Sequence, residues 1–177
     1  MKNKKVLFIA QTAGIAAMYA ALTYAQHLLL PGTTSAAVQF RVSEALNVLA
    51  LFTPAAIPGL TLGCVLSNLV NIGAGLPLDM SLGALATLGA TSCMYTLRHV
   101  KIKDYPLLSL LMPALWNGVI VGWEIEVFFI DGKFNWISFL TQGGLVALGE
   151  LGVMLVLGTL LYVVIVKRKL DQKLFTK

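Results

Sequence analysis

The chain has 177 residues, of which 58% are hydrophobic and only 12% are charged, with a formal net charge of +5. Soluble proteins carry about 25% charged residues, so at a mean hydropathy of +0.82 too few polar side chains remain to cover a globule in water. This composition excludes an ordinary soluble domain. Long apolar runs, rather than alternating ones, favour membrane helices over a membrane β-barrel.

The apolar runs predict a single domain over residues 1–177, built from six membrane-spanning helices. A bilayer core requires about 20 apolar residues per helix. The first run is longer than the apolar part of a secretory signal and no clear cleavage site follows it, so we interpret it as a retained helix. The fold class is therefore an all-α membrane protein. The expected spans cover residues 6–30, 38–53, 55–74, 78–98, 106–129 and 136–166.

Lysine and arginine gather in the segments that six spans would place on one side of the membrane. By the positive-inside rule this side is the cytoplasm, so both termini are expected there, in a multi-pass protein of the plasma membrane. The positive charge then follows from topology, and no nucleic-acid partner is needed to explain it. The basic residues are Lys2, Lys4 and Lys5, then Arg98, Lys101 and Lys103, and finally Lys167, Arg168, Lys169 and Lys173.

The first span carries small residues at a spacing of four, at Ala13, Ala17, Ala21 and Ala25. We call this row the alanine stripe. Residues at this spacing stack on one face of a helix and allow another backbone to approach closely. The stripe predicts either close packing within the chain or a docking face for a separate membrane subunit.

The second span opens with two opposite charges, Arg41 and Glu44, three residues apart on one helical face near its expected outer end. They either form a structural ion pair, or Glu44 accepts hydrogen bonds from a ligand while Arg41 orients it. Asn68 and Asn71, at the outer end of the third span, either contact a ligand or hydrogen-bond neighbouring helices.

The fifth span contains the sequence WNGVIVGWE, which pairs Trp116 with Trp123 and Asn117 with Glu124 at a spacing of seven. Each pair lies on one face of a helix. Trp123 suits an aromatic residue at the membrane interface, whereas Trp116 is deep enough to be core packing or a platform on which a ligand stacks. Asn117 is expected near the midplane and Glu124 near the outer surface.

The sixth span places Gln142 near the outside and Glu150 near the midplane, with no lysine or arginine expected at the depth of Glu150. An ionisable group in hydrocarbon is costly and usually functional. These polar side chains together predict a cavity open to the outside. Carboxylates, amides and indoles suit a planar, nitrogen-rich ligand that is neutral or cationic.

No catalytic or cofactor motif is present. The chain lacks GxxxxGK[ST], HExxH and GxSxG, so it is not expected to hydrolyse ATP by the usual route or to be an enzyme. Cys64 and Cys93 lie in apolar runs with no CxxC partner and are expected to be small buried hydrophobes, without a metal site or a disulfide.

The whole chain resembles the substrate-binding S components of energy-coupling factor (ECF) transporters. The segment FRVSEALNVLALFTPAAIPGLTLGCVLSNL, residues 40–69, together with WNG in the fifth span and GELGV in the sixth, is more specifically similar to the queuosine-precursor transporter family, QueT. The resemblance implies a six-helix S-component bundle.

The resemblance also implies a ligand and partners. The ligand would be a deazapurine: the aminomethyl compound preQ1, the nitrile preQ0, or queuine. The partners would be a transmembrane coupling protein (EcfT-like), contacted through Ala13, Ala17 and Ala21, and two cytoplasmic ATPases (EcfA-like) that use ATP. The implied substrate-binding residues are Glu44, Asn68, Asn71, Trp116, Asn117, Trp123, Glu124, Gln142 and Glu150, with Arg41 supporting Glu44.

Three other functions remain compatible with the same residues. The chain could be an S component for another vitamin, such as riboflavin or thiamine. It could also be a membrane-embedded enzyme that uses Glu150 as an acid or base. The third alternative is a channel-like oligomer that associates through the alanine stripe.

Overall fold

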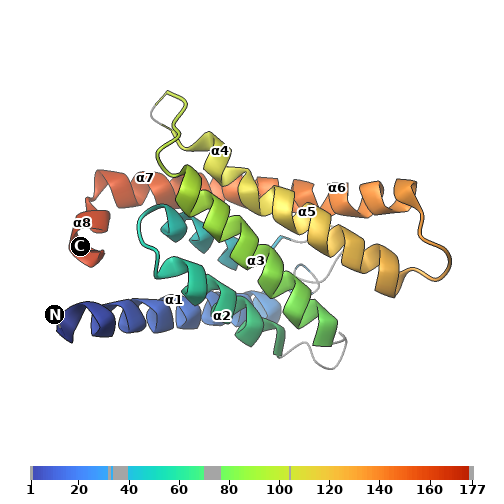
Figure 1. Ribbon diagram of the computed structural model, residues 1–177, viewed down its shortest axis with the longest axis horizontal. Helices are drawn as coiled ribbons and strands as arrows, with labels where there is room; N and C mark the ends of the chain where they lie inside the picture. The colour runs from blue at the N-terminus through green and yellow to red at the C-terminus, as the bar shows by residue number, and fades with distance from the viewer. Residues whose placement is uncertain (1, 32, 34–39, 70–76, 104, 176–177) are drawn as a thin grey trace.

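The computed structural model describes residues 2–31, 33, 40–69, 77–103 and 105–175. These residues form helices joined by short connections, and their one isolated bridge joins Ile102 and Tyr105 (Figure 1). The elements are α1 (Lys2–Leu29), η1 (Val42–Leu51), α2 (Ala56–Asn68), α3 (Pro77–Leu97), α4 (Leu107–Leu110), α5 (Met112–Glu124), η3 (Ile125–Phe129), α6 (Trp136–Val153), η4 (Met154–Gly158), α7 (Thr159–Lys167) and α8 (Leu170–Leu174).

The protein is all-helical as expected, and its described helices lie largely within the predicted apolar runs without establishing six membrane spans. Three helices are long and apolar enough to cross a membrane: Lys4–Leu29, Leu107–Phe129 and Trp136–Lys167. The last two each contain one short π-helical segment, η3 and η4. Two shorter apolar helices, η1 and α2, occupy the second and third predicted spans. The protein is thus a bundle of apolar helices of the kind found in membranes.

The second predicted span differs from an α-helix. Its regular part is η1, a 3₁₀ helix of ten residues, and Arg41 before it has an extended backbone (φ −94°, ψ 102°). A 3₁₀ helix rises about 2 Å per residue, so ten residues extend about 20 Å. The third span is also shorter than predicted within the described residues, since α2 ends at Asn68.

Element η1 is the central element of the bundle. Successive helices pack as neighbours in the order α1, α2, α3, α5 and α6, while η1 contacts α1, α2, α3, α6, η4 and α7. Figure 1 shows α3 crossing between the α1–α2 pair and the α5–α6 pair. The side chains of Val48 and Ala50 in η1 are completely buried. Side chains of η1 are therefore directed at most of the other helices.

Glycines allow the helix pairs to approach closely. A Cβ added at Gly63 of α2 would lie 2.7 Å from Cβ of Tyr19 and 3.0 Å from the carbonyl oxygen of Ala16, both on α1. A Cβ added at Gly122 of α5 would lie 2.5 Å from Cα of Gly143 on α6. In the absence of a hydrophobic driving force between helices in lipid, such close contacts are a principal source of association.

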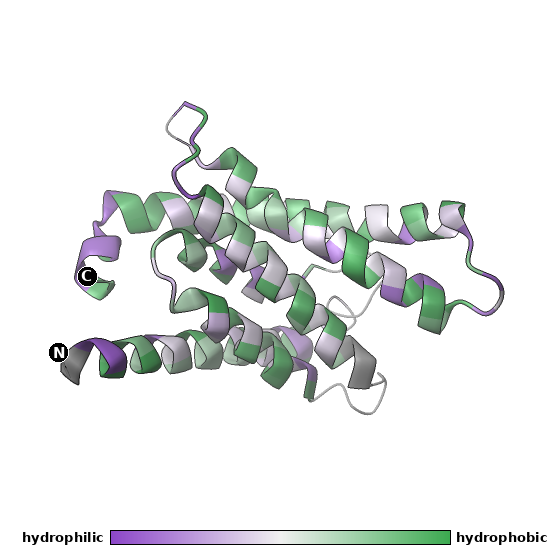
Figure 2. Cartoon of the chain, viewed as in Figure 1, coloured by the Kyte–Doolittle hydropathy of each residue, from purple (hydrophilic) through white to green (hydrophobic). Residues whose placement is uncertain are grey.

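Both termini lie at one end of the bundle, together with the connection from α3 to α4, and the connection from α5 to α6 lies at the other end (Figure 1). We call the first the basic end, because it carries the described basic residues apart from Arg41 and Lys133. Figure 2 shows hydrophilic residues concentrated at the start of α1 and around α8, with hydrophobic residues along the helices.

Candidate functional site

The Glu44 carboxylate lies inside the bundle and accepts two hydrogen bonds. Its side chain is 2% exposed. One oxygen accepts from the hydroxyl of Tyr19 on α1, and the other accepts from Nδ2 of Asn47 at 2.5 Å. Burying a carboxylate is tolerable only when such donors replace water. Glu44 is therefore a positioned charge rather than a side chain that extends to solvent.

The 3₁₀ geometry of η1 explains the contact between Glu44 and Asn47. With about 3 residues per turn, side chains three apart in a 3₁₀ helix eclipse one another. The amide of Asn47 therefore lies directly above the carboxylate, one turn along the helix. Asn47 Oδ1 has no hydrogen-bond partner among the described residues.

The segment before η1 is held by polar side chains of α1. The side chain of Gln26 donates to the carbonyl oxygen of Phe40 and accepts from the backbone N–H of Val42 at 2.8 Å. One turn earlier, the hydroxyls of Thr23 and Ser43 lie 2.7 Å apart. These contacts fix where η1 begins and so position Arg41 at its first turn.

Arg41 is also buried, at 9% exposure. Its Nη1 lies 3.9 Å from Sγ of Cys64 on α2, and Nδ2 of Asn68 lies 3.8 Å from the same sulfur. Its Nε has no hydrogen-bond partner among the described residues. The hydrogen bonds on Glu44 come from Tyr19 and Asn47, and Glu44 also attracts the Arg41 guanidinium electrostatically. The guanidinium retains donor capacity within the bundle.

Glu150 reaches the same region from α6. It is 4% exposed, and its Oε2 has no hydrogen-bond partner among the described residues. Its carboxyl group interacts electrostatically with Glu44 and Arg41, the first repulsive and the second attractive. No lysine or arginine was expected at the depth of Glu150, yet Arg41 lies close enough to interact with it electrostatically.

These side chains form a buried polar cluster, which we define as Tyr19, Arg41, Glu44, Asn47, Cys64 and Glu150. Four helical elements contribute to it: α1, η1, α2 and α6. Asn68 adjoins it through Cys64. Of the residues predicted from sequence, the structure thus brings together Arg41, Glu44, Asn68 and Glu150.

The two predicted tryptophans lie in different environments. Trp116 packs against α3, where a Cβ added at Gly89 would lie 2.5 Å from Cε3 of the indole. Trp123 is 42% exposed and packs edge-on against Phe128, with ring centroids 5.8 Å apart. The exposure of Trp123 is compatible with an interfacial aromatic residue, whereas one face of Trp116 is used in helix packing.

Other predicted residues are distributed along α5 and α6. Asn117 is buried and its Nδ2 has no hydrogen-bond partner among the described residues. Glu124 is buried at the end of α5, and Gln142 is half-buried near the start of α6. Asn71 lies outside the described residues, as do the segments 34–39 and 70–76.

Sequence reasoning missed three members of the buried polar cluster as site residues. Tyr19 and Asn47 complete the coordination of Glu44, and Cys64 offers a sulfur acceptor to Arg41. Cys64 is fully buried, as predicted, whereas Cys93, also predicted to be buried, is only half-buried. Tyr19 stands in a helix otherwise rich in alanine and leucine, and the spacing of Asn47 from Glu44 is the same as that of Glu44 from Arg41.

The alanine stripe is exposed on the surface of α1. Ala13, Ala17, Ala21 and Ala25 are exposed, whereas Ala16 and Ala20 on the neighbouring face are buried. Internal packing of α1 therefore uses the face of Ala16 and Ala20, where Ala16 lies near Gly63 of α2, and leaves the stripe uncovered by the described residues.

The apolar helices and the buried polar cluster define a helical membrane protein that holds charged side chains inside its bundle. The family model of the QueT transporter matches residues 9–167, and the chain belongs to this family. The chain is 30% identical over 164 residues to the queuosine precursor transporter QueT of Lactococcus lactis subsp. cremoris (strain MG1363). The alignment covers 85% of this chain and 87% of that relative. No solved structure matches the chain. Membership in a transporter family identifies a transport protein rather than an enzyme.

Proposed function

We propose that the protein is the substrate-binding S component of an ECF-type transporter that imports a queuosine precursor: preQ1, preQ0 or queuine. The family and the name of the relative support a queuosine precursor. The observation that carries the proposal is Glu150, a buried carboxylate in the polar cluster with an oxygen that lacks a partner among the described residues.

The chemistry of the ligand matches this carboxylate. The guanine-like edge of a deazaguanine presents adjacent N–H groups, which a carboxylate accepts well, and the aminomethyl group of preQ1 adds a cation. An unsatisfied buried acceptor is costly, so a ligand that donates to Glu150 removes that cost. Glu150 is therefore the ligand carboxylate in this proposal.

Glu44 then has a different role from Glu150. Both of its oxygens already accept hydrogen bonds, from Tyr19 and Asn47. Its side chain interacts electrostatically with Arg41 and with Glu150. We assign to Arg41 the task of limiting the repulsion between the two carboxylates, while its Nε remains a donor for the carbonyl oxygen of the ligand.

The transport role requires partners. In this proposal the alanine stripe of α1 docks on a transmembrane coupling protein, and two cytoplasmic ATPases supply the energy by hydrolysing ATP. The exposure of Ala13, Ala17 and Ala21 supports this assignment, because small residues on an uncovered helix face allow a second helix to approach closely. The basic end then faces the cytoplasm.

Titration of the purified protein with preQ1, preQ0 and queuine tests the proposed ligand. We expect saturable binding of at least one of them, and Glu150→Gln should weaken it by roughly 10- to 100-fold, since a hydrogen bond to a charged group contributes about 1.5–3 kcal/mol. Asp131→Asn is the matched control, because Asp131 is an exposed carboxylate in the α5–α6 connection.

Riboflavin and thiamine provide the comparison ligands. Binding of one of these, with none of any deazaguanine, would refute the proposed substrate and leave the fold assignment intact. The ligand should be recovered chemically unchanged after incubation. Conversion of the ligand by the purified chain alone would instead indicate an enzyme acting through Glu150.

A further inference from the structure

A cavity of about 530 Å³ lies at the basic end, away from the buried polar cluster. It lies between the segment after α3, the end of η1, α7 and the C-terminal helix α8. A second cavity of about 670 Å³ adjoins it near the start of α1. The two share the lining residues Phe52, Arg98, His99 and Phe175.

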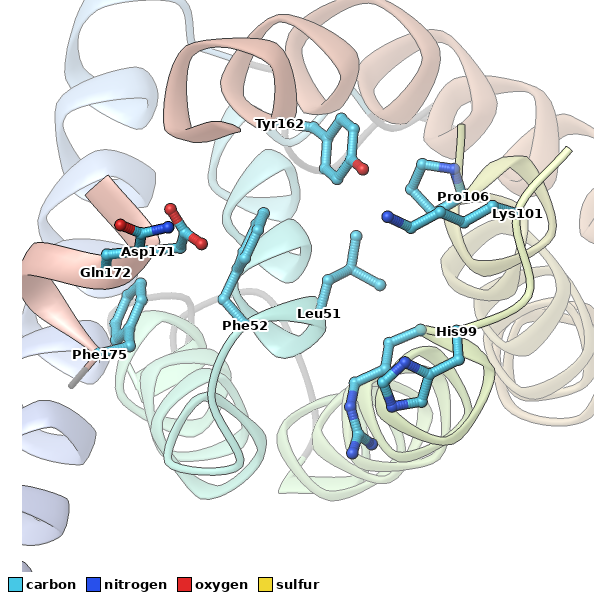
Figure 3. Close-up of a pocket in the computed structure, with 10 residues that line it drawn as sticks. Leu51, Phe52, His99, Lys101, Pro106, Tyr162, Asp171, Gln172 and Phe175 are labelled. Carbon is cyan, nitrogen blue, oxygen red and sulfur yellow. The ribbon is translucent and has the colours of Figure 1, made fainter. Parts of the chain in front are cut away.

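One side of the first cavity is cationic. Figure 3 shows His99 and Lys101 on this side, and Arg98 also lines it. The Arg98 guanidinium lies 3.8 Å from the ring centroid of Tyr95 and its Nη1 donates to the carbonyl oxygen of Tyr95 at 2.6 Å. These contacts orient the guanidinium, and its remaining N–H groups suit the paired oxygens of a phosphate.

The opposite side carries hydrogen-bonding groups from α8. Figure 3 shows Asp171 and Gln172 across the cavity from Lys101. They are positioned because Lys169, with a left-handed backbone (φ 52°), turns the chain after α7, and because Gln11 of α1 donates to the carbonyl oxygen of Leu174 at 2.8 Å. A carboxylate on this side disfavours a second phosphate but accepts well from hydroxyl groups.

The floor of the cavity is apolar. Leu51 and Tyr162 are buried members of the hydrophobic core, and Phe52 stacks on Tyr162 with ring centroids 5.8 Å apart. Figure 3 shows these three side chains between the cationic side and α8. The cavity therefore combines an anion-binding side, a hydroxyl-binding side and an apolar floor.

The segment that carries the cationic side has the composition of a chain lying at a membrane interface. Val100 and Ile102 flank Lys101 and are 46% and 55% exposed. Exposed apolar residues that alternate with lysine bury their side chains at the level of the lipid headgroups while the ammonium groups stay in water. This segment therefore suits the level of the lipid headgroups.

We propose that this cavity binds the headgroup of an anionic glycerophospholipid, with the phosphate held by Arg98 and Lys101 and the headgroup hydroxyls by Asp171 and Gln172. Basic pockets between membrane helices are a known setting for anionic headgroups. Phosphatidylglycerol has both required features, one phosphodiester and a free diol. This site is independent of the transported ligand.

Delipidated protein in detergent tests the site with phosphatidylglycerol and phosphatidylcholine as probes. We expect a larger rise in Tm with phosphatidylglycerol, and native mass spectrometry should show it retained in preference to phosphatidylcholine. Arg98→Gln and Lys101→Gln should each weaken this retention by about fivefold, the effect of one basic residue near a charged membrane surface. Lys133→Gln, an exposed charge at the other end, should change nothing.

Equal stabilisation of the unmodified protein by the two lipids would overturn the proposal, whatever the variants do. So would full retention of phosphatidylglycerol in the Lys101→Gln variant, whose exposed side chain is not needed for folding. Soluble glycerol 3-phosphate is the final probe. If it gives the same rise in Tm at the same concentration, the site recognises a soluble phosphate and the membrane source is wrong.

Discussion

The Glu44 carboxylate is held inside an apolar bundle by two donors from different elements, Tyr19 of α1 and Asn47 of η1. A buried carboxylate that loses a donor retains its desolvation cost without the compensating hydrogen bond. The two donors therefore determine both the stability of the site and the direction in which Glu44 points.

Replacing Tyr19 by phenylalanine tests this at a single atom. We expect Tyr19→Phe to lower the free energy of unfolding by about 1.5–3 kcal/mol, the contribution of a hydrogen bond to a charged group, visible as a lower Tm. Tyr24→Phe is the control, because the Tyr24 hydroxyl donates to the neutral carbonyl oxygen of Leu66 at an exposed position. Equal losses in the two variants would contradict the role of Tyr19.

The charged residues of the buried polar cluster were singled out from the sequence, but their partners Tyr19, Asn47 and Cys64 were not. Charged residues inside apolar runs are rare, so an arginine and two glutamates there can be recognised as candidate site residues from the sequence. Tyrosine in an apolar helix is compatible with ordinary packing, so nothing local distinguishes Tyr19. The contact between Arg41 and Cys64 depends on which helices become neighbours, and the spacing of residues within one span carries no information on that.

Among the elements, the helical character of the apolar runs was predicted, because a long apolar run leaves little freedom to a membrane helix, and three of the described helices are long enough to cross a membrane. The conformation of η1 was not predicted. Residues three apart share a face in both α and 3₁₀ helices, so the spacing of Arg41, Glu44 and Asn47 does not distinguish the two. The contacts of η1 with most of the other helices were also not predicted, because they depend on how the helices pack in the tertiary structure.

The α5–α6 pair depends on a close backbone approach at Gly122. In Gly122→Ala the new Cβ would lie 2.5 Å from Cα and 2.9 Å from N of Gly143, and these backbone atoms cannot rotate away. The helices must separate, so we expect a loss of about 1–3 kcal/mol in unfolding free energy. Thermal unfolding in detergent measures it.

Gly144→Ala is the control for that variant. Gly144 lies on the partner helix α6, next to Gly143, and an added Cβ there would have no atom within 4 Å. Alanine is favoured over glycine in a helix by roughly 0.5–1 kcal/mol, so Tm should stay unchanged or rise. A fall in Tm equal to that of Gly122→Ala would show that the close approach is not the cause.

For the whole molecule, the basic residues at the end that holds both termini predict an orientation in which this basic end faces the cytoplasm. In a background with Cys93→Ser, the remaining native cysteine, Cys64, is buried. Lys133→Cys should react with a membrane-impermeant maleimide in intact cells, and Lys173→Cys only after the cells are permeabilised. The reverse pattern would show that the basic end faces outward.

The exposed alanine stripe predicts an effect on assembly without an effect on folding. Ala17→Leu adds bulk on the uncovered face of α1, so we expect Tm of the isolated chain to be unchanged and co-purification with the proposed ATPases and coupling protein to be lost. Gly144→Leu adds similar bulk at an open position on α6 and should leave co-purification intact. Retained assembly in Ala17→Leu would remove the stripe as the docking face.

Helix α1 exposes Ala17 on its outer face and, two residues later, directs the Tyr19 hydroxyl inward to Glu44. A partner bound on the stripe would therefore be separated from the polar cluster by the width of one helix. If ligand binding shifts α1 and thereby changes the affinity for the partner, partner binding must change the affinity for the ligand by the same factor.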